Sequence, residues 1–209
     1  MPETYAKLHY ENNVDFVPDA VEGPFGIPVI RPEVYEQTVF FPFGNKNANY
    51  KRWDHGVHFF VSDYRFQGIW NNKERYRQML TEYQAVMTPD FSLYTDWPKM
   101  VQVWNHYRKH VLGAWMQSIG CKVYPSIAWS DESSFEWCFD GEPHGATVCV
   151  SSVGTQRNRD AKRMFLIGYD RMMEVLEPET VLFHGTVPPE CKGKIVPVEE
   201  FTRRFRELR

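Results

Sequence analysis

Short apolar runs that alternate with helical patterns are the feature that most constrains the fold of this chain. A β-α-β-α order of this kind predicts a parallel sheet. Because the carboxyl ends of parallel strands share one edge of the sheet and ligands bind there, residues far apart in the sequence are expected to converge. The apolar runs occupy residues 57–62, 85–88, 123–128, 147–151, 180–183 and, more weakly, 194–198.

We expect an α/β fold with a mostly parallel sheet of five to seven strands, compact or shaped as a partial (β/α) barrel. A full eightfold barrel takes about 250 residues, whereas this chain has 209. Residues 1–209 are expected to form a single α/β domain. Within it, 1–50 is an irregular, Pro- and Gly-rich segment with short strands near 27–30 and 38–41, and 51–209 is the repeating β-α core.

Helix start signals and helical periodicity predict five helices. Asn71 opens a capping box, and Asp96, two residues before Pro98, is an N-cap signal. The helix that follows Asp96 has a long apolar stripe and is expected to end at Gly120. The remaining helices are a short one from Ser133, a longer one over 158–176 and a charged terminal one over 198–208.

Composition excludes several classes of protein. The formal net charge is −3 and the pI is about 6.2, so non-specific binding to duplex DNA is not favoured. We find no apolar stretch of membrane-spanning length and no N-terminal targeting pattern. The four cysteines lack the spacing of a structural zinc site and are expected to be reduced thiols. We therefore expect a cytoplasmic protein that does not enter a membrane.

Four carboxylates and a histidine follow the apolar runs and are the candidate catalytic residues. Clustered carboxylates bind Mg²⁺ or Mn²⁺ or exchange protons with a substrate, and we expect Asp63 and Asp90 as metal ligands. Asp131 and Glu132 extend this set, although Asp131 also suits a helix cap. His184 directly follows the run at 180–183 and is a candidate base; the alternative is a hydrogen-bonded structural histidine.

Two aromatic residues and one turn are the candidate ligand-binding groups. Tyr94 and Trp129 could stack on a base or a sugar ring. The turn after residue 151 joins a strand to a helix, and small residues there let backbone N–H groups approach an anion. An ordinary β-α turn is the alternative, since the turn matches neither phosphate-loop motif. The turn residues concerned are Ser152, Gly154, Thr155 and Arg157.

Two further patterns have ordinary explanations. His106 and His110 are four residues apart and share one helix face, as in metalloprotease helices, but no Glu stands beside the first histidine. A role as metal ligands is therefore not favoured. The loop 44–52 is polar and cationic; it is either a solvated connection or a lid.

Several segments together resemble the family known as domain of unknown function 4417. The resemblance covers roughly residues 35–190 and implies an intracellular setting in bacteria or their phages. It implies no activity, and no catalytic residue is carried over from it. The segments that carry the resemblance are 88–98, 103–108, 115–120, 124–129 and 138–141.

Three functions fit these observations. The first is a hydrolase, metal-assisted, that acts on a nucleotide or a nucleic-acid phosphate ligand; its partner would be a small molecule, a nucleotide or a single strand of nucleic acid. The second is a non-catalytic module that sequesters a small nucleotide or blocks a host protein. The third is an assembly protein of a phage, which a large exposed apolar patch would favour.

Overall fold

The computed structural model describes residues 7–9, 12–45, 51–156 and 158–198. The expected terminal helix over 198–208, apart from its first residue, and the ligand-binding candidate Arg157 therefore lie outside the described residues, as does most of the loop 44–52. The N-terminal segment contains a small antiparallel pair, β1 (Val21–Glu22) and β2 (Ile27–Pro28).

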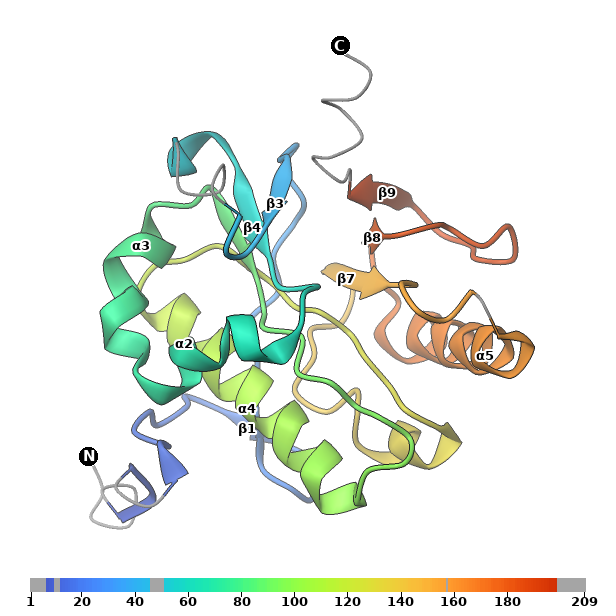
Figure 1. The fold of residues 1–209 in the computed structure, drawn as a ribbon, viewed down its shortest axis with the longest axis horizontal. Helices are drawn as coiled ribbons and strands as arrows, with labels where there is room; N and C mark the ends of the chain where they lie inside the picture. The colour runs from blue at the N-terminus through green and yellow to red at the C-terminus, as the bar shows by residue number, and fades with distance from the viewer. Residues whose placement is uncertain (1–6, 10–11, 46–50, 157, 199–209) are drawn as a thin grey trace.

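Two parallel sheets follow one another along the chain. The first sheet pairs its strands in the order β3-β4-β5-β6, and the second pairs β7-β8-β9 (Figure 1). A single parallel bridge between Ser126 and Cys149 joins the two sheets. The strands therefore share one direction and follow sequence order, so the expected parallel sheet is confirmed. The strands are β3 (Phe40–Pro42), β4 (Gly56–His58), β5 (Ala85–Met87), β6 (Val123–Tyr124), β7 (Thr147–Ser151), β8 (Thr180–His184) and β9 (Ile195–Val198).

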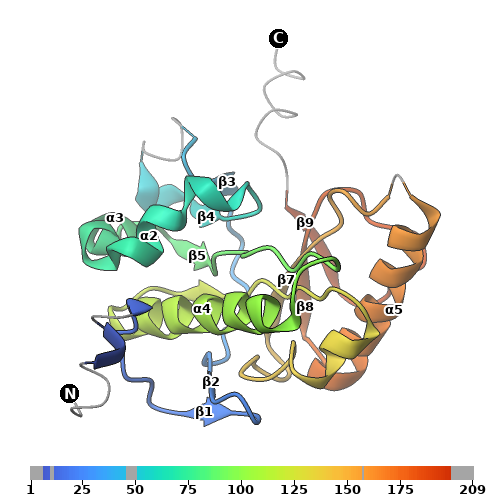
Figure 2. The ribbon, with the colours of Figure 1, turned by 60° about the horizontal axis from the view of Figure 1, so that its bottom comes forward.

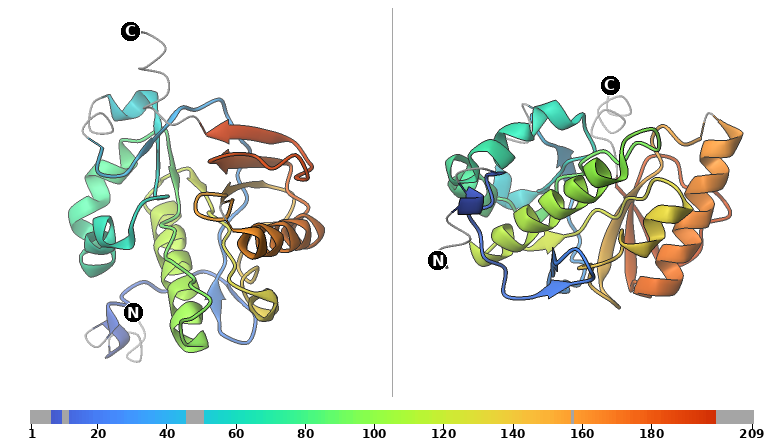
Figure 3. Two further views of the ribbon diagram at one scale, coloured as in Figure 1. Left: turned by 45° about the vertical axis from the view of Figure 1, so that its right-hand side comes forward. Right: turned by 90° about the horizontal axis from the view of Figure 1, so that it is seen from below.

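Helices connect successive strands and cover the outer face of the sheets. Helix α5 (Arg159–Leu176) lies beside β7 to β9, and α4 (Lys99–Ser118) runs along the first sheet (Figures 2 and 3). The short α2 (Gln67–Asn71), η4 (Lys73–Tyr76) and α3 (Arg77–Thr81) connect β4 to β5. Helix η3 (Asp63–Arg65) follows β4, η2 (Arg52–Asp54) precedes it, and η5 (Glu132–Glu136) follows β6.

Alternate residues of the strands pack into different cores. Val148, Val150 and Phe183 face the helices, whereas Cys149 and Leu182 face inward. The inward residues of six strands form one buried cluster that also contains Phe40, Ala85, Met87, Tyr124 and Val198. Both faces of the sheets are therefore buried, as parallel sheets require.

The strands curl around this inner core as a partial barrel. The two outermost strands, β3 and β9, both line a groove of about 210 Å³. Among the described residues no ladder pairs these two strands, so the barrel remains open along that seam. The expected partial-barrel shape is thus confirmed, with the opening between the first and last strands.

Three of the expected helix starts were wrong. The capping residue is Asn72 rather than Asn71, because the Asn72 side chain accepts the N–H of Arg75 at 3.3 Å. Asp96 is exposed and does not cap α4, which begins only at Lys99 because Pro98 before it keeps an extended ψ of 135°. The short helix after β6 is capped by Asp131 instead of Ser133. The helix over 158–176 is confirmed, with the Asn158 side chain as its cap.

Leu182→Ala tests the inner core of the partial barrel. Leu182 is 1% exposed and belongs to the buried cluster of inward-facing side chains that forms this core. Removing its buried methyl groups leaves a cavity, so we expect a loss of about 2–5 kcal/mol in the free energy of unfolding. Denaturant titration measures this loss. Val34→Ala, at a side chain that is 60% exposed, is the control and should change stability by less than about 0.5 kcal/mol. Equal losses in both variants would contradict the barrel core.

Candidate functional site

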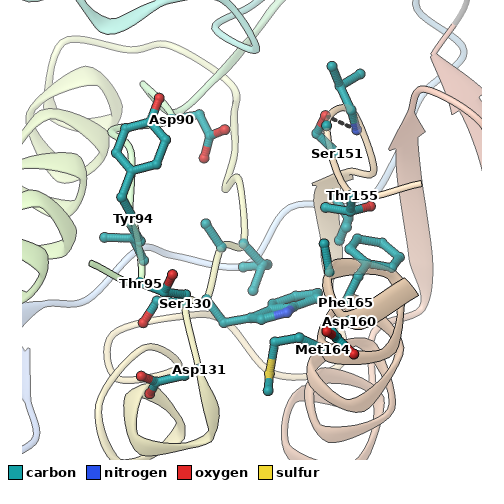
Figure 4. Close-up of a pocket in the computed structure, with 18 residues that line it drawn as sticks. Asp90, Tyr94, Thr95, Ser130, Asp131, Ser151, Thr155, Asp160, Met164 and Phe165 are labelled. Atoms are coloured by element: carbon teal, nitrogen blue, oxygen red, sulfur yellow. Dashed lines mark hydrogen bonds between the residues drawn. The ribbon is translucent and has the colours of Figure 1, made fainter. Parts of the chain in front are cut away.

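A cleft opens where the two sheets separate. Two hydrogen bonds form the bridge that joins the sheets. The Ile127 N–H donates to the Cys149 carbonyl at 2.7 Å, and the Cys149 N–H donates to the Pro125 carbonyl at 2.8 Å. Beyond Ile127 the chain turns away toward η5, while β7 continues to Ser151. The cleft has a volume of about 630 Å³ and is lined from 90–95, 127–131, 150–155 and the first turns of α5 (Figure 4).

Asp90 lies in this cleft, three residues beyond the end of β5. Burial raises the pKa of the Asp90 carboxyl to about 7; the charge of Lys109 acts in the opposite direction, and the charge of Asp63 adds to the rise. Within the described part of the chain no hydrogen bond to the Asp90 carboxyl is present. This carboxyl therefore changes its protonation state near neutral pH.

Asp63 does not line the cleft. Its two carboxylate oxygens accept hydrogen bonds from Ser92, one from the N–H at 3.1 Å and one from the hydroxyl at 2.8 Å. Asp63 also opposes the fall in the pKa of Arg108, which burial lowers to about 10. The carboxylate thus anchors the segment that carries Asp90. Metal binding by Asp63 and Asp90 stays a prediction, and a cation there would have to displace the Ser92 contacts.

Asp131 and Glu132 separate in the structure. Asp131 lines the cleft, but its carboxylate also caps η5 by accepting the N–H of Ser133 at 2.9 Å. Glu132 is exposed and lies outside the lining. The capping alternative for Asp131 is therefore present in the structure, and the two residues do not form a carboxylate pair in the cleft.

His184 packs in an aromatic group beside the cleft. Its ring lies 4.9 Å from that of His58 and is stacked 5.0 Å from that of Phe60, centroid to centroid. Burial, together with His184, lowers the pKa of His58 to about 3. The Ser151 hydroxyl lies 3.0 Å from Nδ1 of His184, and Ser151 lines the cleft. His58 and Ser151 were not among the candidate residues; they are the last residues of the observed strands β4 and β7, and the expected strand at 57–62 placed His58 near its start instead.

The two aromatic candidates line the cleft. Tyr94 is half-exposed on one side (Figure 4). The Trp129 indole packs 5.5 Å from the Phe165 ring and lies so close to Gly168 of α5 that a Cβ there would overlap it. The Trp129 side chain is therefore held by α5 as well as by its own loop.

The turn after β7 contributes only part of the expected anion site. Gly154, with φ of 88°, and Thr155 line the cleft. Ser152 is buried, and its hydroxyl donates to the Thr186 carbonyl at 2.7 Å. The Asn158 side chain accepts the N–H groups of Asp160 and Ala161 at 2.8 and 3.4 Å. Two N–H groups of the α5 N-terminus are thus already paired.

The lining of the cleft is acidic. Among the described residues its lining contains Asp90, Asp131 and Asp160 but neither Lys nor Arg. Most of the remaining lining is apolar, including Leu93 and Met164. A cleft of this composition favours a neutral or cationic ligand over a phosphate.

A buried cluster lies near this cleft. His106, His110 and Glu142 each offer one ligand atom, and these atoms lie within 4.8 Å of one another. The helical spacing of the histidines was visible in the sequence. Glu142 was missed, because nothing local indicates that a residue 32 positions from His110 contacts it.

The partial barrel and its strand-end cleft define a parallel α/β protein with a cleft at the carboxyl edge of its strands. The chain belongs to the family Domain of unknown function (DUF4417), whose model matches residues 20–202. The resemblance inferred from the sequence is thereby confirmed. No solved structure matches the chain.

Two phage proteins are similar to the chain. It is 39% identical to the Gene 1 protein of Mycobacterium phage L5 over 129 residues, which is 62% of this chain and 56% of that protein. It is 35% identical to the Gene 1 protein of Mycobacterium phage D29 over 163 residues, 77% and 60% of the two chains. The chain thus spans less than two thirds of the length of these relatives. None of the helices described here is both long and apolar enough to cross a membrane.

The pH dependence of stability tests Asp90. The pKa of an unfolded Asp is about 3.9, whereas the pKa of folded Asp90 is about 7. The folded protein therefore holds this proton more tightly, and the stability of the natural chain should fall as pH rises from about 4 to about 7. Asp90→Asn should not show the fall that comes from this carboxyl. Above pH 7 its free energy of unfolding should exceed that of the natural chain by roughly 2 kcal/mol, after allowance for partial exposure.

Urea titrations from pH 4 to 8 measure the difference between the two proteins. The control is Asp160→Asn, which changes an exposed aspartate of the same cleft. Parallel profiles for the natural chain and Asp90→Asn would contradict the raised pKa.

Gly168→Ala tests the packing of Trp129 against α5. The added methyl group would overlap the Trp129 indole, so we expect the ring to move and the free energy of unfolding to fall by about 1–3 kcal/mol. Thermal melting and a crystal structure of the variant measure the two effects. Asp170→Ala, at an exposed position of the same helix, is the control. An unmoved indole in Gly168→Ala would show that the contact is looser than described.

Proposed function

We propose that the cleft binds a small planar ligand of the nucleobase or nucleoside type and that Asp90 acts on it as a general acid or base. The observation that carries the proposal is the carboxyl of Asp90, which lies in the cleft with a pKa of about 7. General acid–base catalysis is most effective when the pKa of the group lies near the working pH. A strongly shifted pKa in a cleft is itself typical of a functional site.

The walls of the cleft support a planar ligand. Trp129, Tyr94 and Phe165 provide aromatic surface, and Leu93 and Ile127 add apolar surface. Aromatic side chains stack on any base because each base has a π-face. The volume of about 630 Å³ lies within the range of small-molecule pockets.

The hydrogen-bonding capacity of Asp90 supports a nitrogen heterocycle. A protonated carboxyl both donates and accepts, so it can pair with adjacent N–H and ring-nitrogen groups of a base. The acidic lining suits a neutral or cationic heterocycle. The proposed ligand therefore differs from the phosphate ligand expected from the sequence. Asp90 would give a proton to the leaving atom of the ligand or take one from an attacking water.

A non-catalytic binding module is the second candidate. It is favoured by the capping contact of Asp131, whose carboxylate is already engaged by the N–H of Ser133 and is therefore less available for an acid–base pair with Asp90. Such a module needs the aromatic walls and the hydrogen bonds of Asp90 but no proton transfer. It would sequester a small nucleoside-like ligand.

Ligand-observed NMR with a panel of nucleobases and nucleosides tests the proposal. We expect members of the panel to bind the natural chain. Trp129→Ala should weaken binding about 5- to 150-fold, the loss of about 1–3 kcal/mol of stacking. Trp53→Ala, at a side chain 68% exposed and outside the cleft, should bind as the natural chain does. If no panel member binds, or both variants weaken binding equally, the ligand class is wrong.

Asp90→Asn separates the two candidates. The enzyme should retain binding within a few-fold and lose most turnover of the bound ligand, with a pH–rate profile that reports a group titrating near 7. The binding module should show no product with either protein in long incubations followed by mass spectrometry.

A further inference from the structure

We propose that His106 and His110 of α4, together with Glu142, form a buried site for a divalent transition-metal cation, with Zn²⁺ as the preferred ion. The site is separate from the cleft and from the carboxylates considered there. It does not depend on the function proposed for Asp90.

The three residues converge in the interior. His106 and His110 lie one helical turn apart, with ring centroids 4.4 Å from each other. None of the three side chains is more than 2% exposed. Glu142 reaches the helix because Gly141, with φ of 76°, approaches it closely: a Cβ on Gly141 would lie 2.7 Å from the Pro28 carbonyl and 2.8 Å from Nδ1 of His110.

Backbone carbonyls determine which ring nitrogens carry protons. Nε2 of His106 lies 3.1 Å from the Asp140 carbonyl, and Nδ1 of His110 lies 2.8 Å from the Pro28 carbonyl. A carbonyl oxygen only accepts, so both of these nitrogens must donate an N–H. In the neutral rings, the other nitrogens, Nδ1 of His106 and Nε2 of His110, therefore present lone pairs.

These lone pairs lack a proton donor. Nδ1 of His106 and Oε2 of Glu142 are both buried without a hydrogen-bond partner. Nε2 of His110 lies 3.0 Å from Oε1 of Glu142, so a lone pair faces a carboxylate oxygen. Buried acceptors of this kind are costly unless a cation or a proton lies between them.

A metal cation satisfies all three groups. Metal-binding histidines usually donate their second N–H to a carbonyl or carboxylate, as both of these rings do. A proton on Nε2 of His110 is the competing solution, but it would satisfy only the contact with Oε1 of Glu142. Nδ1 of His106 and Oε2 of Glu142 would still be buried without a partner.

Lys109 engages only one of the two carboxylate oxygens of Glu142. Its ammonium pairs with Oε1 of Glu142 and donates to the Ser126 carbonyl at 2.9 Å, which leaves Oε2 of Glu142 available. Two imidazole nitrogens and one carboxylate oxygen are a ligand set that Zn²⁺ takes in proteins. Zinc bonds of about 2.0–2.2 Å place tetrahedral donors about 3.4 Å apart, so ligand atoms that lie within 4.8 Å of one another need to approach by up to about 1.4 Å.

Elemental analysis of the full chain tests the site. The chain is expressed in zinc-supplemented medium, purified and dialysed, and we expect one equivalent of Zn²⁺ per chain. Prolonged treatment with a chelator should remove the metal and lower the melting temperature. A second sample, refolded with Co²⁺, should show the visible absorption bands of protein-bound Co²⁺ with nitrogen ligands.

Matched histidine variants separate this site from surface binding. His106→Gln should lose the stoichiometric zinc, whereas His144→Gln, at an exposed histidine two residues after Glu142, should retain it. Because a buried substitution can unfold the chain, the Co²⁺ spectrum of the natural chain is an independent measurement. A folded natural chain that takes up neither Zn²⁺ nor Co²⁺ in stoichiometric amount would overturn the proposal and identify a metal-free Lys–Glu–His network. Full zinc retention in folded His106→Gln would overturn it as well.

Discussion

The single bridge between β6 and β7 is the constraint on which the arrangement of the cleft depends. β6 is only two residues long and is followed by Pro125, whose missing N–H cannot extend a ladder. The two sheets are joined by the bridge at Ser126 and Cys149, and among the described residues no strand ladder extends this junction. The space between the diverging chains becomes the cleft, and both of its walls carry residues from strand ends.

Behind this cleft, α4 carries an unusual amount of buried polarity. Lys109 is 3% exposed and pairs with Glu142, and its charge also acts on Asp90. The same ammonium donates to Ser126, the residue of the bridge. One buried cation thus connects the junction of the two sheets, the carboxyl of the cleft and the histidine cluster. Burying such a charge is costly unless it is paired, which explains why its partners are packed so tightly around it.

The sequence predicted much of the fold because apolar runs and their spacing are local signals. The runs at 147–151 and 180–183 became β7 and β8 almost residue for residue, and the helix expected over 158–176 became α5. The wrong helix starts at Asn71 and Asp96 had a common cause. Several residues in each segment could cap, and the choice among them depends on the backbone path into the helix, which tertiary contacts determine.

The sequence by itself determined that strand-end residues would gather at one edge, since parallel strands with intervening helices permit no other arrangement. Tertiary structure alone decided which of them share a cavity. Asp90, Tyr94 and Trp129 line the cleft. The Asp63 carboxylate instead accepts a hydrogen bond from Ser92, and His184 packs against His58. Only the fold could bring Glu142 to His106 and His110 or give Asp90 its raised pKa. Both effects come from burial and contact between residues distant in the chain, and no local pattern encodes them.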